Sequence, residues 1–518
     1  MQPVFTAEQM RRLDARAVAE RGIPGAILME NAGRGAAEAL LAALPARGLR
    51  ARGLRAAIVC GKGGNGGDGF VVARRLKRAG ARPAVYLAAP PEEIRGDAAA
   101  KYHEMRRAGI AATVVGEGGA LAPRLAGADV VVDALLGTGT RGPLAPPMAS
   151  LIEAVNASAR PVVALDIPSG LPADGEPPSG PVVRAWLTTT FAGLKLGLVI
   201  GPGVALAGRV VVVDIGAPVE LAGDVTTFLL DAADVAPLFP PRARDAHKGT
   251  YGHLLVIAGS VGKTGAAALC ARAAMRAGTG LVTVATSASA QPVVASLSLE
   301  TMSEPMPETE ARTIALKARD ALTELGKARD AVAIGPGLGL DEETRRLVRE
   351  LVRELPRPMA VDADALTALT GHLDDLRAAA GPRCLTPHPG EMARLVGASI
   401  ADVQRDRIGT ARAFAVRHGV HVCLKGSRSV IAGPDGRVLL NPTGNPGMAS
   451  GGTGDVLTGI LGGLLARGLP AERALAAAVY LHGLAGDVAA ERVGEEALVA
   501  GDVIESLGEA FRRLAHDS

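Results

Sequence analysis

Two series of short apolar runs, rich in Val, Ile, Leu and Ala and separated by helical patterns, recur along the chain. Such runs are typical of parallel strands buried on both faces of a sheet, because the helices between them cover those faces. In the first half they fall at 56–60, 82–88, 129–136, 161–167 and 209–215. In the second half they fall at 254–258, 281–286, 331–334, 359–361, 383–385 and 420–424. No clear internal repeat relates the halves, so we expect two different α/β domains.

The length of the chain supports this division, since 518 residues are too many for one hydrophobic core. The character of the sequence changes over 217–250, and 238–244 is rich in proline and polar residues. We expect a first domain over 1–216, a connector over 217–225 with 245 as its outer limit, and a second domain over 226–518.

Composition excludes several classes of partner. The 56 Lys and Arg residues nearly balance the 53 Asp and Glu residues, which gives no case for nucleic acid or an anionic membrane. No stretch approaches the roughly 20 apolar residues that span a bilayer, and residues 1–10 lack the apolar core of a signal peptide. The four cysteines form no C-x-x-C pair and lie in or beside apolar stretches. We therefore expect a cytoplasmic protein with reduced, buried thiols and small-molecule partners.

A glycine-rich segment over 61–69 follows the first apolar run, with six glycines in nine residues. Glycines let the backbone approach a ligand, and the N-terminus of the expected helix favours an anion. Residues 64–69 satisfy G-x-G-x-x-G, but the acid that a dinucleotide fingerprint needs about 20 residues later is missing, since residues 70–91 contain no Asp or Glu. An ordinary dehydrogenase is therefore disfavoured. A glycine turn that only packs helix against strand is the structural alternative.

Acids at strand ends form a second group of candidates. Asp133, Asp166 and Asp214 end apolar runs, where ligands of open α/β sheets bind. The loop over 137–142 adds hydroxyl groups and Arg141, which suits a phosphate. Each acid alone could equally be a helix cap.

Four motifs, at 29–33, 63–69, 132–139 and 166–170, resemble the NAD(P)H-hydrate epimerase domain, over roughly residues 1–216. The resemblance implies a Rossmann-like parallel three-layer sandwich that interconverts the R and S hydrates. It implies a potassium ion near Asn65, Asp133 and Ser169, whose oxygen atoms suit a hard cation. Asp166 is our first choice for the proton-handling group and Lys195 the second, with a solvated loop cation as the alternative for Lys195. The expected hydrate-binding residues are Gly64, Asn65, Gly66, Gly67, Asp68, Gly137, Thr138, Gly139, Thr140, Arg141, Gly142 and Asp166.

The sharpest motif of the chain is NPGMASGGTGDVLTG at 445–459. Glycines before a helix form an anion hole from free backbone N–H groups. Asp455 at that turn is placed to accept a proton from a hydroxyl while those donors hold a phosphoryl group. The segment 262–264 is not a P-loop, because Ile257 stands where the first glycine belongs.

The loops 335–339, 386–391 and 425–429, together with 445–459, resemble the ADP-dependent NAD(P)H-hydrate dehydratase domain, over roughly residues 226–510. The resemblance implies a ribokinase-like fold in which Asp455 handles the hydrate hydroxyl and ADP donates a phosphoryl group. Ala266, Gly339, His388 and Asp455 would face the hydrate. Lys425, Gly426, Ser427, Arg428, Ser429 and Gly454 would face ADP. Magnesium is expected on the phosphates, held mostly by water and nucleotide oxygens, and a homo-oligomer is expected.

Two other functions remain open from the sequence. The second domain could be a ribokinase-superfamily kinase for a vitamin precursor, because the same glycine-rich turn serves both reactions. The first domain could be a non-catalytic nucleotide-binding module. Fusion of two domains that act on one substrate favours repair of hydrated NADH and NADPH.

Overall fold

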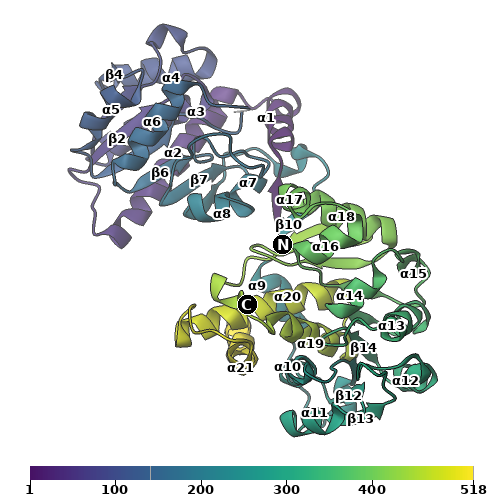
Figure 1. Cartoon of the computed structure of the whole chain (residues 1–518). Coiled ribbons are helices and arrows are strands. Elements are labelled where there is room, and N and C mark those ends of the chain that lie inside the picture. The colour runs from purple at the N-terminus through teal and green to yellow at the C-terminus, as the bar shows by residue number, and fades with distance from the viewer. Residues whose placement is uncertain (140–141, 517–518) are drawn as a thin grey trace. The chain divides into compact units, whose positions relative to one another are not determined.

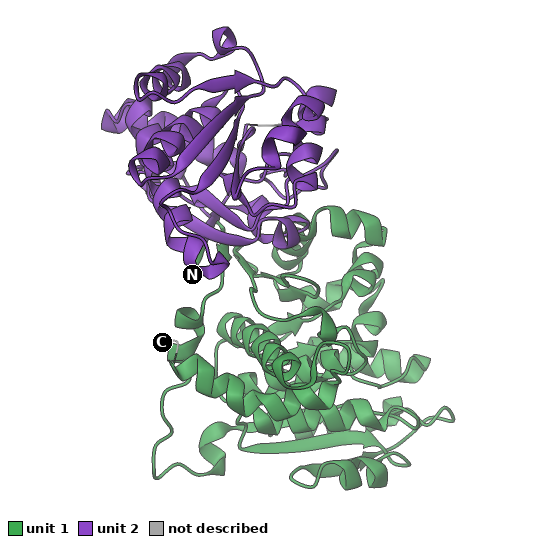
Figure 2. Ribbon diagram, turned by 90° about the vertical axis from the view of Figure 1, so that its left-hand side faces the viewer, with its two compact units in different colours: residues 1–2, 226–518 green, residues 3–225 purple. Residues whose placement is uncertain are grey.

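The computed structural model describes residues 1–139 and 142–516. It divides into two compact units, one made of residues 3–225 and the other of residues 1–2 and 226–518 (Figure 2). The proline-rich segment 238–244 lies within the second unit. Among the described residues, no helix is long and apolar enough to cross a membrane.

The first unit is built on a parallel seven-stranded sheet with the order β4-β3-β2-β5-β6-β7-β9. The strands are β2 (Arg55–Cys60), β3 (Arg82–Leu87), β4 (Ala112–Val114), β5 (Val130–Ala134), β6 (Val162–Leu165), β7 (Leu187–Phe191) and β9 (Arg209–Val213). A further parallel pair joins β1 (Gln2–Phe5) to β8 (Leu194–Lys195).

Helices cover both faces of this sheet (Figure 1). They are α1 (Ala7–Arg21), α2 (Gly25–Ala43), α3 (Gly64–Arg78), α4 (Gly96–Arg107), α5 (Gly118–Leu125), α6 (Pro146–Ala157), α7 (Leu196–Val199) and α8 (Gly203–Leu206). Alternate residues of β2 point to opposite faces: Ile58 packs in one core cluster with α2, α3 and α4, and Val59 in another with α5 and α6. The expected Rossmann-like three-layer sandwich is confirmed.

The second unit has a mainly parallel sheet in the order β13-β12-β11-β14-β15-β16-β17-β18-β19-β10. Only the pairs β17–β18 and β18–β19 are antiparallel within this part of the described chain. The strands are β10 (Thr227–Leu229), β11 (His253–Ile257), β12 (Leu281–Ser287), β13 (Met302–Met306), β14 (Ala331–Ile334), β15 (Met359–Val361), β16 (Arg383–Leu385), β17 (His421–Leu424), β18 (Val430–Ala432) and β19 (Val438–Leu440).

Helices again lie on this sheet, as the expected ribokinase-like α/β domain requires. They are α9 (Ala232–Val235), α10 (Thr264–Arg276), α11 (Gln291–Leu297), α12 (Arg319–Lys327), α13 (Glu342–Glu354), α14 (Asp364–Leu369), α15 (Asp374–Arg377), α16 (Pro389–Val396), α17 (Ile400–Arg405), α18 (Arg407–His418), α19 (Thr453–Ala466), α20 (Ala471–Val493) and α21 (Ala500–His516). The central helix of the core is α19, which is buried along most of its length.

Glycines allow α19 to approach its neighbours closely. A Cβ at Gly459 would collide with the carbonyl oxygen of Cys270 on α10, and one at Gly462 would lie 3.0 Å from the Cβ of Ala333 on β14. The helix is therefore held between α10 and the sheet, which fixes the position of its first turn.

Candidate functional sites

The glycine-rich segment of the first unit is helical from Gly64, where the sequence indicated a loop up to residue 69. Close packing explains the difference. A Cβ at Gly66 would collide with the Gly61 carbonyl oxygen, and one at Gly67 with the Met29 side chain. These glycines therefore serve helix packing, and the first turn of α3 begins directly at the end of β2.

A cavity of about 740 Å³ opens at the carboxyl ends of the strands in this unit. Of the residues expected to bind the hydrate, it is lined by Gly64, Asn65, Asp68, Gly137, Thr138, Gly139 and Asp166. Gly66, Gly67 and Gly142 are not among its lining residues, and Thr140 and Arg141 lie outside the described residues. Asp214 does not line it either; its Oδ1 accepts a hydrogen bond from Gly216 N at 2.7 Å.

Asp166 and Lys195 form a buried ion pair on the cavity wall, with 2.6 Å between Lys195 Nζ and Asp166 Oδ1. Lys195 is 1% exposed, which excludes the alternative of a solvated loop cation. Its ammonium also donates to the Phe191 carbonyl oxygen at 2.6 Å. Asp166 has a positive φ of 65°, a strained conformation of the kind often found at functional sites. Its Oδ2 accepts a hydrogen bond from Thr138 N at 3.3 Å.

The three expected potassium ligands are connected through Leu136, whose N–H donates to the Ser169 hydroxyl oxygen at 2.9 Å. Ser169 donates from its hydroxyl to Asp133 Oδ1 at 2.7 Å, and Asn65 donates from Nδ2 to the Leu136 carbonyl oxygen at 2.7 Å. Asp133 is fully buried, and burial raises its pKa to about 6 although hydrogen bonds from Ser169 oppose this. Asn65 Oδ1 is buried without a hydrogen-bond partner in the described chain. An unpartnered amide oxygen beside a buried carboxylate and a hydroxyl fits a hard monovalent cation.

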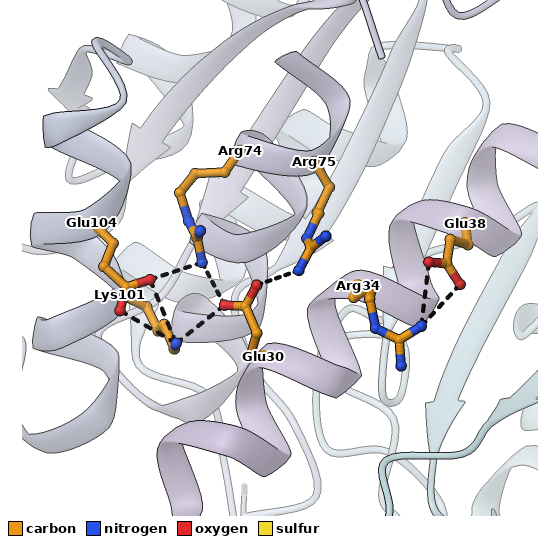
Figure 3. A network of polar contacts seen from close by, with 7 residues as sticks. All are labelled: Glu30, Arg34, Glu38, Arg74, Arg75, Lys101 and Glu104. Carbon is orange, nitrogen blue, oxygen red and sulfur yellow. Dashed lines mark hydrogen bonds and ion pairs between the residues drawn. The ribbon is translucent and has the colours of Figure 1, made fainter. Parts of the chain in front are cut away.

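The segment 29–33 holds the cavity wall in place. Met29 and Ala32 line the cavity, while Asn31 Nδ2 donates to the Ile215 carbonyl oxygen at 2.9 Å. Between them, Glu30 accepts from Arg74, Arg75 and Lys101 at 2.5, 2.6 and 3.1 Å, so that it ties α2 to α3 and α4 (Figure 3).

These contacts set the charge state of Glu30. Burial by itself would raise its pKa, but hydrogen bonds from Arg75 and Lys101 and the charge of Arg74 outweigh this and hold the pKa at about 2.

The sequence analysis missed Asp14, which lines the same cavity. Met10, Asp14 and Val18 line it at a spacing of four residues, which places them on one face of α1. A single acid at helical spacing among apolar residues is the signal that could have found it.

In the second unit, Asp455 lies in the first turn of α19. Burial raises its pKa to about 6, and the charge of Asp362 adds to the rise while Lys425 opposes it. Asp362, also missed, follows β15 directly and is 1% exposed. It accepts from Lys425 Nζ at 2.9 Å and from the Thr458 hydroxyl at 2.7 Å. The strand-end rule that found Asp133 and Asp166 applies equally to Asp362.

A second cavity, of about 410 Å³, adjoins this turn. All six residues expected to face ADP line it, namely Lys425, Gly426, Ser427, Arg428, Ser429 and Gly454. The sequence analysis missed Asn441, Thr443 and His482 in its lining. Lys425 Nζ lies 3.4 Å from the position that a Cβ on Gly454 would occupy, so this ammonium lies directly against the first turn of α19.

None of the residues expected to face the hydrate lines the second cavity: Ala266, Gly339, His388 and Asp455 are absent from its wall. Gly339 N donates to Asp364 Oδ2 at 2.8 Å, and Ala266 lies on α10 near the loop that contains Gly337. His388 Nδ1 accepts from Gly390 N at 3.0 Å and thereby caps α16. Its Nε2 lies 3.6 Å from Glu391 Oε2, and the side chain remains half exposed.

No group of three or more His, Cys, Asp or Glu side chains in residues 1–139 and 142–516 is arranged to hold a metal ion. A magnesium ion carried on nucleotide phosphates needs no such cage. The cysteines Cys60, Cys270, Cys384 and Cys423 are all buried and unbridged.

Two families match the chain. The NAD(P)H-hydrate dehydratase family matches residues 254–507, and the family described as YjeF-related protein N-terminus matches residues 25–197.

Full-length relatives carry both parts. A bifunctional NAD(P)H-hydrate repair enzyme of Moorella thermoacetica is 45% identical over 521 residues, covering 99% of this chain and 97% of the relative. One of Escherichia coli is 35% identical over 509 residues, covering 97% and 93%. An ADP/ATP-dependent NAD(P)H-hydrate dehydratase of Bacillus subtilis, co-crystallised with ATP/Mg²⁺, is 33% identical over 55% of this chain and 98% of that structure, with a TM-score of 0.49.

Proposed function

The chain belongs to the family of bifunctional NAD(P)H-hydrate repair enzymes, and we propose that it restores hydrated NADH and NADPH in two steps. Residues 1–216 epimerise the R and S hydrates, and residues 226–518 dehydrate the S hydrate with ADP. The segment 217–225 connects them. The observation that carries this proposal is that each part has its own cavity next to a carboxylate: Asp166 lines the first, and Asp455 directly follows Gly454, which lines the second.

In the first cavity, Asp166 handles the proton of the hydrate and Lys195 fixes its carboxylate. The ion pair at 2.6 Å and the Thr138 amide leave the carboxylate little freedom to turn. A rigid group within reach of the substrate is what general acid–base catalysis needs. Asn65, Asp133 and Ser169 would hold a potassium ion, which would supply a fixed positive charge to the site.

In the second unit, Asp455 takes the proton of the hydrate hydroxyl. The hydroxyl oxygen then attacks the β-phosphorus of ADP, whose bond to the bridging oxygen breaks to release AMP. The carbon–oxygen bond of the phosphorylated hydrate breaks next, inorganic phosphate leaves with the electron pair, and loss of a proton from the neighbouring carbon restores the double bond. Lys425 and the N-terminus of α19 line the second cavity and would face the phosphates, whose charge a magnesium ion would neutralise.

The kinase alternative predicts a different product. A vitamin-precursor kinase would leave its phosphoryl group on the acceptor, whereas the dehydratase releases it. The relatives that align over nearly the whole chain are repair enzymes, which favours dehydration.

Product analysis with the full chain tests the proposal. With S-NADPH hydrate, ADP and Mg²⁺, we expect one AMP and one phosphate for each NADPH formed, and no AMP without hydrate. A phosphorylated hydrate as the final product, or no turnover with either ADP or ATP, would contradict it.

A further inference from the structure

The carboxylate of Asp14 lines the cavity but stabilises no other group of the described residues by a direct polar contact. Its neighbours on α1, Leu13 and Ala17, are buried in the core, and Met10 and Val18 share its face toward the cavity. Within residues 1–139 and 142–516, Asp14 makes no hydrogen bond and no ion pair. The Asp14 side chain is exposed within the cavity, so its unpaired carboxylate is open to a bound ligand.

Four other charged groups line this cavity with Asp14: Asp166 and Lys195 at the strand ends, Asp68 on α3, and Lys62 before α3. Although the Asp14 side chain meets solvent in the cavity, the walls raise its pKa to about 6, the charge of Asp166 adds to the rise, and Lys195 opposes it. Asp166 differs because the Lys195 ammonium and the Thr138 amide contact it directly. The cavity thus holds three carboxylates: Asp166, which is paired with Lys195, Asp68, which is buried at the start of α3, and Asp14, which is exposed in the cavity. The paired Asp166 and the accessible Asp14 can divide the acid and base roles between them.

The chemistry of the hydrate requires two such groups. Water added to the enamine double bond of a dihydronicotinamide places a hydroxyl on the carbon next to the ring nitrogen. Inversion at that carbon follows when the hydroxyl leaves from one face of the ring and water returns on the other. One group must protonate the leaving hydroxyl, and a second must deprotonate the incoming water.

We propose that Asp14 is the second acid–base residue of the epimerase site and works on the face of the hydrate opposite to Asp166. This role rests on the proposed function. Asp14 donates a proton to the hydroxyl, the carbon–oxygen bond breaks with its electron pair on the departing water, and the ring nitrogen lone pair forms a C=N bond. Water then adds to the other face, the π electrons return to nitrogen, and Asp166 takes the proton. The reverse direction exchanges the two roles, and solvent returns the proton between turnovers.

The test follows epimerisation alone, in the full chain without ADP, from purified R-NADPH hydrate by chromatography. We expect Asp14→Asn to lower kcat by about 100-fold with KM changed less than threefold, and Asp14→Glu to recover part of the loss. The control is Glu20→Gln, an exposed acid on the same helix paired with Arg16, which should retain wild-type kcat.

A pH profile separates this role from a structural one. In the active form, the carboxylates of Asp14 and Asp166 together carry one proton, which lies on Asp14. Because Asp14 loses this proton as the pH rises through about 6, the wild-type rate of epimerisation should fall over the same range. Asp14→Asn should remove this limb, while dehydration of S hydrate with ADP stays at the wild-type rate and so reports an intact chain. Wild-type kcat and pH profile in Asp14→Asn would overturn the role of Asp14 alone. A wild-type protein that leaves the epimers unconverted would overturn the epimerase function and this role together.

Discussion

Lys195 Nζ lies 2.6 Å from Asp166 Oδ1, and both side chains are held by backbone groups of neighbouring strand ends. The two residues are 29 positions apart (195 − 166) and meet only because the strands β6 and β8 place them on one cavity wall. The pair fixes the carboxylate that we propose as the proton-handling group of the first unit. In the second unit, Lys425 Nζ lies 2.9 Å from Asp362 Oδ1.

Asp166→Asn should abolish epimerisation and spare dehydration. The amide keeps the shape of the side chain but cannot act as a base, so we expect a loss of about 10²- to 10⁴-fold in kcat. Conversion of R hydrate measures the loss, and S hydrate with ADP measures the unaffected half. Asp214→Asn is the matched control, since Asp214 also follows a strand but lies outside the cavity. Equal loss in both variants would contradict the role of Asp166.

Potassium should activate the first unit through Asn65. Replacing K⁺ by tetramethylammonium should slow epimerisation of the wild-type protein, because the bulky ion cannot enter between Asn65 Oδ1, Ser169 and Asp133. Asn65→Leu should be slow in both salts, as no amide oxygen remains to bind the cation. Rates measured against KCl concentration, with thermal unfolding to verify the fold, test this. A wild-type rate independent of K⁺ would speak against the site.

Asp455→Asn should abolish dehydration, by about 10²- to 10⁴-fold, and leave epimerisation intact. Asp455 has to be ionised to accept the hydroxyl proton. Because burial and Asp362 raise its pKa to about 6, the wild-type dehydration rate should fall as the pH drops through 6. Asp320→Asn, an exposed acid on α12 of the same unit, is the control. Dehydration that persists unchanged at pH 5 would count against Asp455 as the base.

Glu30→Gln should destabilise the first unit by about 1–3 kcal/mol, because Arg74 and Lys101 are nearly buried and would lose a charged partner. Glu38→Gln, which breaks an exposed pair with Arg34 on the same helix, should cost less than about 0.5 kcal/mol (Figure 3). Denaturant unfolding of both variants measures the difference, and equal costs would contradict the assignment.

The stabilisation of the first unit by Glu30 should also depend on pH. The pKa of Glu30 is lowered from its ordinary value of 4.5 to about 2, so its stabilisation is complete above pH 4.5 and is lost as the pH falls toward 2. Wild-type protein should lose more stability over this window than Glu30→Gln.

The strands that are continuous apolar runs, such as Val130–Ala134, could be predicted because parallel strands buried on both faces have this pattern. The strand Leu187–Phe191 was missed because three of its five buried residues are threonines. The helical start of α3 at residues 64–69 could not be predicted, because glycine disfavours helices. Only the close contacts of Gly66 and Gly67 in the structure show why this helix needs glycine there. Asp166, Asp455 and Lys425 stand in motifs and were found. Asp14 belongs to no motif. It lines the same cavity as Asp166 because of the way in which α1 packs, and the packing of a helix cannot be read from a single sequence.

The central claim is that one chain carries both activities, and recovery of NADPH absorbance from a mixture of R and S hydrates tests it most directly. With ADP, Mg²⁺ and K⁺, the wild-type protein should restore the absorbance completely, and Asp166→Asn should stop when the S hydrate is spent. A wild-type protein that stops at the same point would contradict the epimerase assignment, and one that restores no absorbance would contradict the repair function as a whole.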